Sequence, residues 1–362
     1  MSHKKGVATQ LNIERNRGTR NRIPNHYSTE IKIKKEEVLF KVTKNGKTRR
    51  IIFSVSMVKN EADIIESFVR YHQHIFDGMV FLVNMSTDRT PDILEKLTEE
   101  GLPIFLFYDT DREFDQSKKT TQLMFNTFEQ FQPDIILPLD ADEFLVSSDN
   151  LQHPCDILNK IDLNELHHID WRTYVLNEIE NRNELFIPKR ITFARADHHE
   201  VNHKVVVSAN IAKNYPGALS DGNHKYRIKR GKRKVKINSI KELRIAHFPI
   251  RSLEQFKSKL LVSWINRLSR QKIENLYYLE RFVQIIKDGK ISTEDDLIQL
   301  VKDYHCNTDL KDITLVHKPV DLSFCKPLNL KYTKENEVDA LLNLLDNCEE
   351  MAKEFFRLKR ER

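Results

Sequence analysis

The fold is decided by the stretch Asp134-Ile-Ile-Leu-Pro-Leu-Asp-Ala-Asp-Glu-Phe-Leu145. Residues 135–139 form a short apolar run, which is typical of a buried strand, and this run leads directly into Asp140. Residues i and i+2 of an extended chain point the same way, so we expect Asp140 and Asp142 to project from one face. Adjacent carboxylates repel, and a divalent cation such as Mn²⁺ or Mg²⁺ relieves that repulsion. The alternative is a solvated acidic turn.

Three similar apolar runs precede this stretch, and a helical pattern follows each of them. The expected strands cover 51–58, 79–83, 103–108 and 134–139, and the expected helices cover 60–76, 90–100 and 117–131. Strands that alternate with helices predict an α/β fold with a doubly wound, mainly parallel sheet. Ligands bind such sheets at the carboxyl ends of the strands. Further along, we expect strands at 166–176, 186–193, 201–209 and 243–247, and helices over most of 252–305 and at 335–358.

Polar side chains also follow the first two expected strands. Asn60 and Glu61 come after the first strand, where an amide and a carboxylate can hold a base or a ribose by hydrogen bonds. Asn60 can equally be a helix N-cap. Asn84, Ser86 and Asp88 follow the second strand, as part of a nucleoside pocket or of an ordinary capped loop.

The order of these motifs resembles the glycosyltransferase family 2 superfamily, which has the GT-A fold. It is closest to the branch that carries Asp-Ala-Asp-Glu-Phe and is also similar to family 92, and the resemblance covers about residues 50–265. It implies a sugar transfer from a nucleotide-diphosphate sugar, UDP-sugar favoured, to an acceptor hydroxyl, with inversion in most relatives. Glu61 and Asn84 or Asp88 would contact the nucleoside, and Asp140 and Asp142 would bind metal and diphosphate. Val83-Asn84-Met85 replaces the usual Asp-Asp-Gly, which leaves the identity of the nucleotide open.

A second segment, Ile245-Ala-His-Phe-Pro-Ile-Arg-Ser-Leu-Glu-Gln-Phe-Lys257, resembles a signature of the same branch. A single histidine after a strand is more often structural, but the resemblance implies that His247 is a third metal ligand. Arg251 and Lys257 would then neutralise the diphosphate, Arg251 through its planar fork and Lys257 as a point charge.

The region between these segments is rich in histidine and carboxylates. The resemblance places His203, Lys204 and His224 on the donor or acceptor side of the pocket. The histidine spacing matches no zinc motif. An inverting transferase needs a carboxylate base, and the sequence does not rank three candidates, which are Asp197, Glu200 and Asp221.

Charge is distributed unevenly along the 362 residues. Residues 1–50 contain 14 Lys/Arg and 4 Asp/Glu, and residues 225–236 contain 8 Lys/Arg around a predicted hairpin turn at Arg230-Gly231. These segments are either solvated or attracted to an anionic membrane or a polyanion. The rival hypothesis is therefore a polyanion- or nucleic-acid-binding protein on an inactive α/β scaffold.

Three regions are expected: a basic arm (1–48), a GT-A catalytic domain (49–265) and a helical region (266–362). We find no GxGxxG or P-loop motif, which disfavours a dinucleotide or P-loop site. The four cysteines are widely spaced, which favours a reducing compartment. Since neither a secretory signal nor a transmembrane run is found, we expect a cytoplasmic protein, peripheral to the inner face of a membrane if the basic arm binds lipid.

Overall fold

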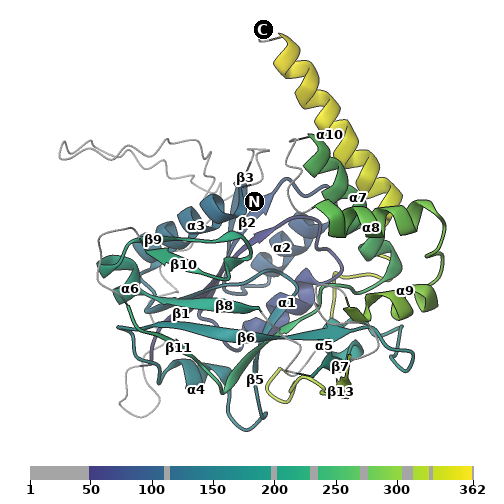
Figure 1. Ribbon diagram of the computed structural model, residues 1–362. Helices are drawn as coiled ribbons and strands as arrows, with labels where there is room; N and C mark the ends of the chain where they lie inside the picture. The colour runs from purple at the N-terminus through teal and green to yellow at the C-terminus, as the bar shows by residue number, and fades with distance from the viewer. Residues whose placement is uncertain are drawn as a thin grey trace, which may run out of the picture.

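The computed structural model describes residues 49–109, 115–196, 202–228, 235–269, 276–303, 313–325 and 329–360. The predicted basic arm and the centre of the predicted hairpin lie outside these residues. The main sheet runs in the order β13-β7-β6-β8-β4-β1-β2-β3 (Figure 1). Its strands are β1 (Ile52–Val58), β2 (Gly78–Asn84), β3 (Ile104–Asp109), β4 (Ile135–Pro138), β6 (Leu166–Val175), β7 (Phe193–Arg195), β8 (His203–Ser208) and β13 (Leu315–His317).

One half of this sheet is parallel and carries the predicted α/β pattern. β4, β1, β2 and β3 pair in parallel, and β8 joins β4 antiparallel. Two more strands extend the other half, because β11 (Ile237–Ser239) and β12 (Leu243–His247) both pair with β6 in parallel. β12 also pairs antiparallel with β5 (Glu143–Ser147), which brings the segment after β4 beside His247. The α/β class with a helical C-terminal region is therefore confirmed.

Helices cover both faces, as in a doubly wound sheet. Alternate residues of β1 enter separate cores, Ile52 on one face and Phe53 on the other. The first core contains α1 (Ile65–His72), α2 (Thr90–Glu99), α7 (Leu253–Ser269), α8 (Leu276–Lys287) and α9 (Glu294–Leu300). The second contains α3 (Gln116–Phe131), α6 (Ala209–Asn214) and the hairpin of β9 (Gly217–Leu219) with β10 (Tyr226–Ile228). The remaining helical elements are α4 (Pro154–Leu158), α5 (Ile187–Arg190), α10 (Ala340–Arg360), η2 (Asp221–Asn223) and η3 (Val301–Asp303).

Two local predictions were wrong. The predicted strand at 186–193 is mostly the short helix α5, because Pro188 starts a turn instead of extending the chain. The predicted hairpin over 225–236 does not pair its own flanks: β10 pairs with β9, whereas β11 pairs with β6. The predicted domain boundary at 265/266 falls within α7, and the division into regions stays a prediction.

A buried carboxylate ties the chain that precedes α10 to α1. The two oxygens of Glu66 accept hydrogen bonds from the backbone N–H groups of Lys331 (2.8 Å), Tyr332 (2.9 Å) and Thr333 (2.7 Å). The Nε atom of Arg70 donates a fourth at 2.7 Å, and the Glu66 side chain is fully buried. Burial alone would raise the pKa of Glu66, but these hydrogen bonds outweigh it and the pKa is lowered. We call this arrangement the Glu66 clamp.

The start of β2 leaves no space for a side chain. A Cβ atom at Gly78 would lie 2.4 Å from the ring of Phe53, which is fully buried and packs against Phe131. Gly78→Ala is therefore expected to lower the free energy of unfolding by about 1–3 kcal/mol, the usual cost of overpacking. Chemical denaturation measures this. In a Phe53→Leu background the same substitution should cost clearly less, and an equal cost in both backgrounds would contradict the steric explanation.

Candidate functional site

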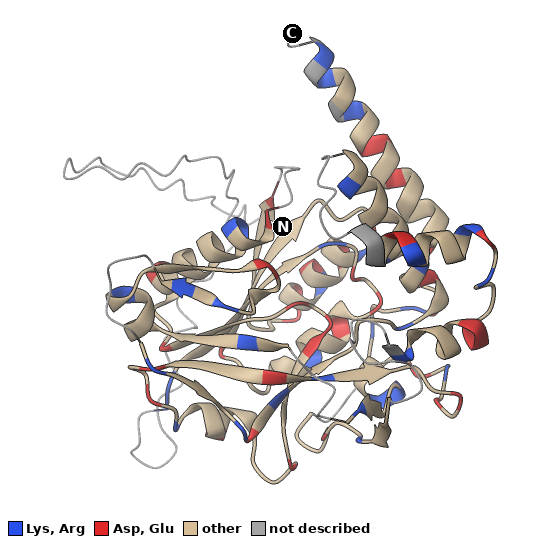
Figure 2. Cartoon of the chain, in the orientation of Figure 1, with Lys and Arg blue, Asp and Glu red and all other residues tan. Residues whose placement is uncertain are grey.

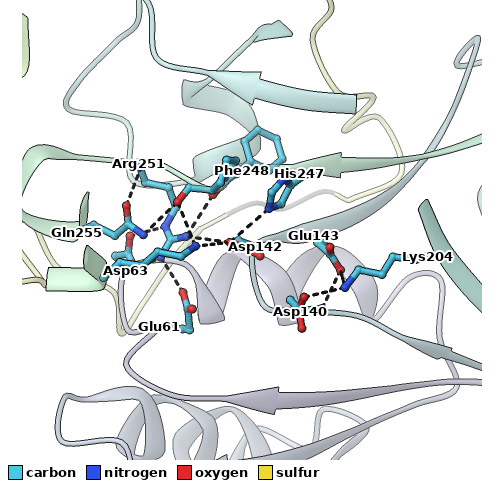
Figure 3. Close-up of polar contacts among 12 residues, drawn as sticks. Glu61, Asp63, Asp140, Asp142, Glu143, Lys204, His247, Phe248, Arg251 and Gln255 are labelled. Carbon is cyan, nitrogen blue, oxygen red and sulfur yellow. Dashed lines mark hydrogen bonds and ion pairs between the residues drawn. The ribbon is translucent and has the colours of Figure 1, made fainter. Parts of the chain in front are cut away.

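The first part of the site is a cluster of the buried residues Glu143 and Lys204 with the partly exposed Asp140. β4 ends at Pro138 and the chain turns, with the Glu143 backbone N–H donating to the Asp140 carbonyl at 3.1 Å. Lys204 on β8 lies 2.7 Å from Asp140 Oδ2 and 2.8 Å from Glu143 Oε2 (Figure 3). Burial would lower the pKa of Lys204, but the two carboxylates outweigh it and raise that pKa. Burial raises the pKa of Glu143, and the neighbouring aspartates raise it further against the opposing effect of Lys204.

Asp142 faces a different set of partners. Lys259 Nζ lies 3.2 Å from Asp142 Oδ2, and both His247 Nε2 and Arg251 Nη1 lie 3.8 Å from it. β12 supplies His247 and α7 supplies Lys259. Burial would raise the pKa of Asp142, but Lys259, His247 and Arg251 together hold it well below its usual range. Asp142 is thus a carboxylate that faces Lys259, Arg251 and the His247 imidazole, which come from parts of the chain distant in sequence.

The sequence predicted that the two aspartates project from one face, but in the structure they do not. Asp140 points toward Lys204, whereas Asp142 points toward Arg251 and His247 (Figure 3). The physical reason is the turn after β4, because side chains alternate regularly only in an extended strand. Among the described residues, no group of three His, Cys, Asp or Glu side chains is placed to hold a metal ion as it stands. The chemistry of the predicted ligands still fits Mn²⁺ or Mg²⁺, since two carboxylates and an imidazole offer hard oxygen donors and one nitrogen.

Arg251 connects this turn to the segment after β1. Its Nε donates to Asp63 Oδ2 at 2.6 Å and its Nη2 to Glu61 Oε2 at 2.7 Å, while Nη1 donates to the Phe248 carbonyl at 3.2 Å. Arg251 is 2% exposed. Burial raises the pKa of Glu61 and Arg251 opposes that effect. The Arg251 guanidinium was predicted to bind diphosphate, but in the structure it binds the carboxylates of Asp63 and Glu61.

α7 places a different lysine at the site from the one predicted. The predicted Lys257 pairs with Glu254 of its own helix at 3.5 Å, whereas Lys259 reaches Asp142. Gln255 and Lys259 are spaced i, i+4 on α7 and therefore lie on one face of that helix, whereas Arg251 precedes its start at Leu253. Gln255 accepts a hydrogen bond from the Arg251 backbone N–H at 3.1 Å.

The segments after β1 and β2 brace each other. Asn60 is not an N-cap, because α1 begins at Ile65 and Asn60 has a left-handed φ of 55°. Its Oδ1 accepts from the Thr87 backbone N–H at 2.8 Å. Asp88 accepts from the backbone N–H groups of Ala62 (3.0 Å) and Thr90 (2.9 Å). Both side chains predicted to bind the nucleoside thus shape the loop that would hold it.

Asn84 belongs to a buried cluster at the ends of β2 and β3. Its Nδ2 donates to Asp109 Oδ2 at 2.7 Å, and Lys119 Nζ lies 2.7 Å from the same oxygen. All three side chains are buried. Asp109 and Lys119 could not be predicted from local sequence, because their proximity depends on how α3 packs over β3.

A third loop approaches Asp140 through Gln116. Gln116 Nε2 donates to Asp140 Oδ1 at 3.0 Å, and its Oε1 accepts from the Gly222 backbone N–H at 3.0 Å. The base candidate Asp221 lies in this loop and is exposed. The other two candidates, Asp197 and Glu200, lie outside the described residues. Gln116, the first residue of α3, was not predicted as a site residue.

His203 and His224 meet beside the site. His224 Nδ1 lies 2.8 Å from the His203 carbonyl oxygen, and both side chains line a pocket of about 200 Å³. The ring of His224 packs on Trp171 at 5.1 Å between centroids, and Trp171 packs on His247 at 4.1 Å. Trp171 thus contacts both His224, which lines this pocket, and His247, which faces Asp142.

No protein-family model and no curated protein matches the chain. Among solved structures, it is similar to TarS 1-349 of S. aureus, at 12% identity and a TM-score of 0.35, over 60% of this chain and 65% of that one. It thus spans slightly less than two thirds of TarS. It is also similar to mannosyltransferase PcManGT from Pyrobaculum calidifontis in complex with GDP-Man and Mn²⁺. The identity is 12% and the TM-score 0.34, over 65% of this chain and 68% of that one. A third similar structure is glucosyl-3-phosphoglycerate synthase from Mycobacterium tuberculosis in complex with Mg²⁺ and uridine diphosphate. The identity is 16% and the TM-score 0.30, over 62% of this chain and 81% of that one. At such identities and TM-scores, function must be argued from the side chains.

Proposed function

We propose that this chain is a metal-dependent glycosyltransferase of the GT-A type, related to family 2, which transfers a sugar from a nucleotide-diphosphate sugar to an acceptor hydroxyl. A UDP-sugar is the favoured donor. One observation carries the proposal: Asp140 and Asp142, at the carboxyl end of β4, lie among Lys204, Lys259 and His247. Carboxylates for a cation and ammonium groups for an anion, side by side at a strand end, are what a metal–diphosphate complex requires.

Asp140, Asp142 and His247 would hold Mn²⁺ or Mg²⁺. Such a cation, when bound, offsets the charge of a nucleoside diphosphate as it leaves. Lys259 is the side chain best placed to bind a phosphate oxygen, because 37% of it is exposed while its Nζ already lies at Asp142. Lys204 is buried and holds the turn by its contacts with Asp140 and Glu143. Arg251 fixes the position of Glu61 relative to Asp142, so its effect on the donor is one of positioning.

The nucleoside would bind beyond β1 and β2, where Glu61 lies and where Asn60, Asn84 and Asp88 organise the loop. The acceptor would enter past the loop that contains Asp221. An inverting transfer needs a carboxylate that takes the acceptor proton. Asp221 is the one base candidate within the described residues, and Gln116 connects its loop to Asp140 by hydrogen bonds. We propose no diphosphate contact for Lys257, because Lys259 faces Asp142 whereas Lys257 pairs with Glu254.

A thermal-shift screen of UDP-, GDP-, CDP- and dTDP-sugars, with and without Mn²⁺, tests the proposal. A ligand that binds only the native state stabilises it by RT ln(1 + [L]/Kd), about 2.7 kcal/mol at a hundredfold excess over Kd. We expect a rise in Tm with a UDP-sugar that requires Mn²⁺ and is absent in Lys259→Met.

Lys257→Met is the matched control and should respond as the wild type does. The rival hypothesis would be favoured if none of the four nucleotide classes raised Tm and the protein bound polyanions without metal and with a strong dependence on salt. That hypothesis rests on residues 1–48 and on the centre of 225–236, which lie outside the described part of the chain.

A further inference from the structure

The last helix, α10, is held to the body by hydrogen bonds near its start. Near its start, Asn343 Nδ2 donates to Ser258 Oγ of α7 at 2.9 Å, and the Ala340 backbone N–H donates to Glu254 Oε2 at 3.1 Å. Beyond this base, α10 projects away from the sheet and its helices (Figure 1). A helix held in this way is already formed before anything binds its outer part, so binding there does not require the helix to fold.

The outer part, residues 353–360, is called the α10 tip. It carries Phe355 and Phe356, which are 70% and 56% exposed. Across the described residues, these are the only exposed phenylalanines. Two adjacent aromatic side chains in water are unfavourable, and an exposed apolar patch of this kind usually marks an interaction surface.

Charge along α10 changes sign from the middle to the tip (Figure 2). Residues 346–350 contain Asp346, Glu349 and Glu350, whereas the α10 tip contains four basic residues and one acidic residue. Lys353, Arg357 and Lys359 are exposed there, and Lys353 pairs with Glu350 at 2.9 Å, so Arg357 and Lys359 are the cationic groups that flank the aromatic pair. Aromatic side chains flanked by Lys and Arg favour the interface of an anionic bilayer, where rings enter the headgroup region and cations meet lipid phosphates.

We propose that the α10 tip docks this protein on an anionic lipid surface through Phe355 and Phe356. Among the described residues, no helix is both long and apolar enough to cross a membrane. In this proposal the two phenylalanines enter the headgroup region, and the acidic middle of α10 remains outside it because anionic lipids repel it. A second copy of this chain is the competing occupant of the exposed leucines nearer the base, Leu341 and Leu345.

Co-sedimentation of the full chain with lipid vesicles tests this proposal without any sugar transfer. We expect binding to vesicles that contain about one third phosphatidylglycerol, weak binding to pure phosphatidylcholine, and a loss of binding as salt is raised. The double variant Phe355→Ser/Phe356→Ser should reduce partitioning about tenfold or more. Ile179→Ser, which removes a side chain that is 77% exposed outside α10, is the matched control and should bind as the wild type does.

Two results would overturn the proposal. One is that the double phenylalanine variant binds anionic vesicles as tightly as the wild type, because the contact would then lie elsewhere, for example in the basic segment 1–50. The other is that sedimentation velocity shows a dimer that the same variant dissociates, while vesicles bind neither protein. That outcome would assign the exposed face of α10 to a second copy of the chain.

Discussion

Asp142→Asn is expected to lower Mn²⁺-dependent hydrolysis of the donor sugar nucleotide by about a thousandfold, the loss typical of removing one preorganised electrostatic contact. The substitution keeps the shape of the side chain and removes its charge. Lys259 and Arg251, which lie 3.2 and 3.8 Å from Asp142, would then face an amide, and the proposed cation would lose a ligand. Released nucleoside diphosphate, measured at saturating donor and metal, gives the rate.

Loss of stability has to be separated from loss of chemistry in this experiment, because uncoupling a buried ion pair also destabilises a protein. Glu66→Gln is the matched control: it removes a buried, ion-paired carboxylate of the same chain on α1, away from β4. It should lower Tm while leaving the rate per folded molecule unchanged. Asp142→Asn that retains wild-type turnover would refute the role proposed for this carboxylate.

Glu66→Gln is expected to lower the free energy of unfolding by about 3–5 kcal/mol, because it breaks a buried pair with Arg70 and weakens three backbone hydrogen bonds. Asp288→Asn, which removes an exposed carboxylate paired with Lys290, is the comparison and should change stability far less than Glu66→Gln, because solvent screens the exposed pair. Urea denaturation at neutral pH measures both. Equal losses in the two variants would contradict the importance of burial in the Glu66 clamp.

The same carboxylate gives a pH dependence with a definite sign. The pKa of Glu66 in the folded protein is lowered from 4.5, so its stabilising contribution is fully present above about pH 4.5 and is lost as pH falls through the folded value. The difference in unfolding free energy between wild type and Glu66→Gln should therefore shrink below that pH. A difference that grows on acidification would show that Glu66 is protonated in the folded state.

Local patterns in the sequence were sufficient for the elements that build the parallel half of the sheet. The apolar runs predicted β1 to β4, and helical spacing predicted α2 and α3 almost to their ends. These predictions succeed because burial on both faces makes a parallel strand apolar throughout, and because a helix between strands must bury one stripe. The predicted first helix began too early, since Asn60 takes a left-handed conformation in a loop that Ser86 and Thr87 hold by hydrogen bonds.

The candidate site could be located from the sequence only in part. Lys204 lies at Asp140 and His247 lies near Asp142, but the two aspartates face different partners, so the predicted metal set stays a prediction. Lys259 and Gln116 were missed, because their proximity depends on the angles at which α7 and α3 pack. The partners of Arg251 were missed for the same reason: Glu61 and Asp63 are about 190 residues away along the chain. Such contacts have no local pattern in the sequence.

The bond between Asn343 and Ser258 has a mechanical consequence. Ser258 precedes Lys259 on α7, so the base of α10 is attached one residue away from the lysine that faces Asp142. Force applied at the far end of α10 would pass through two stiff helices to Lys259, with no flexible linker to absorb it. Pulling on that end would therefore change the rate of the proposed sugar transfer, whereas pulling at Leu151 on an exposed loop would not.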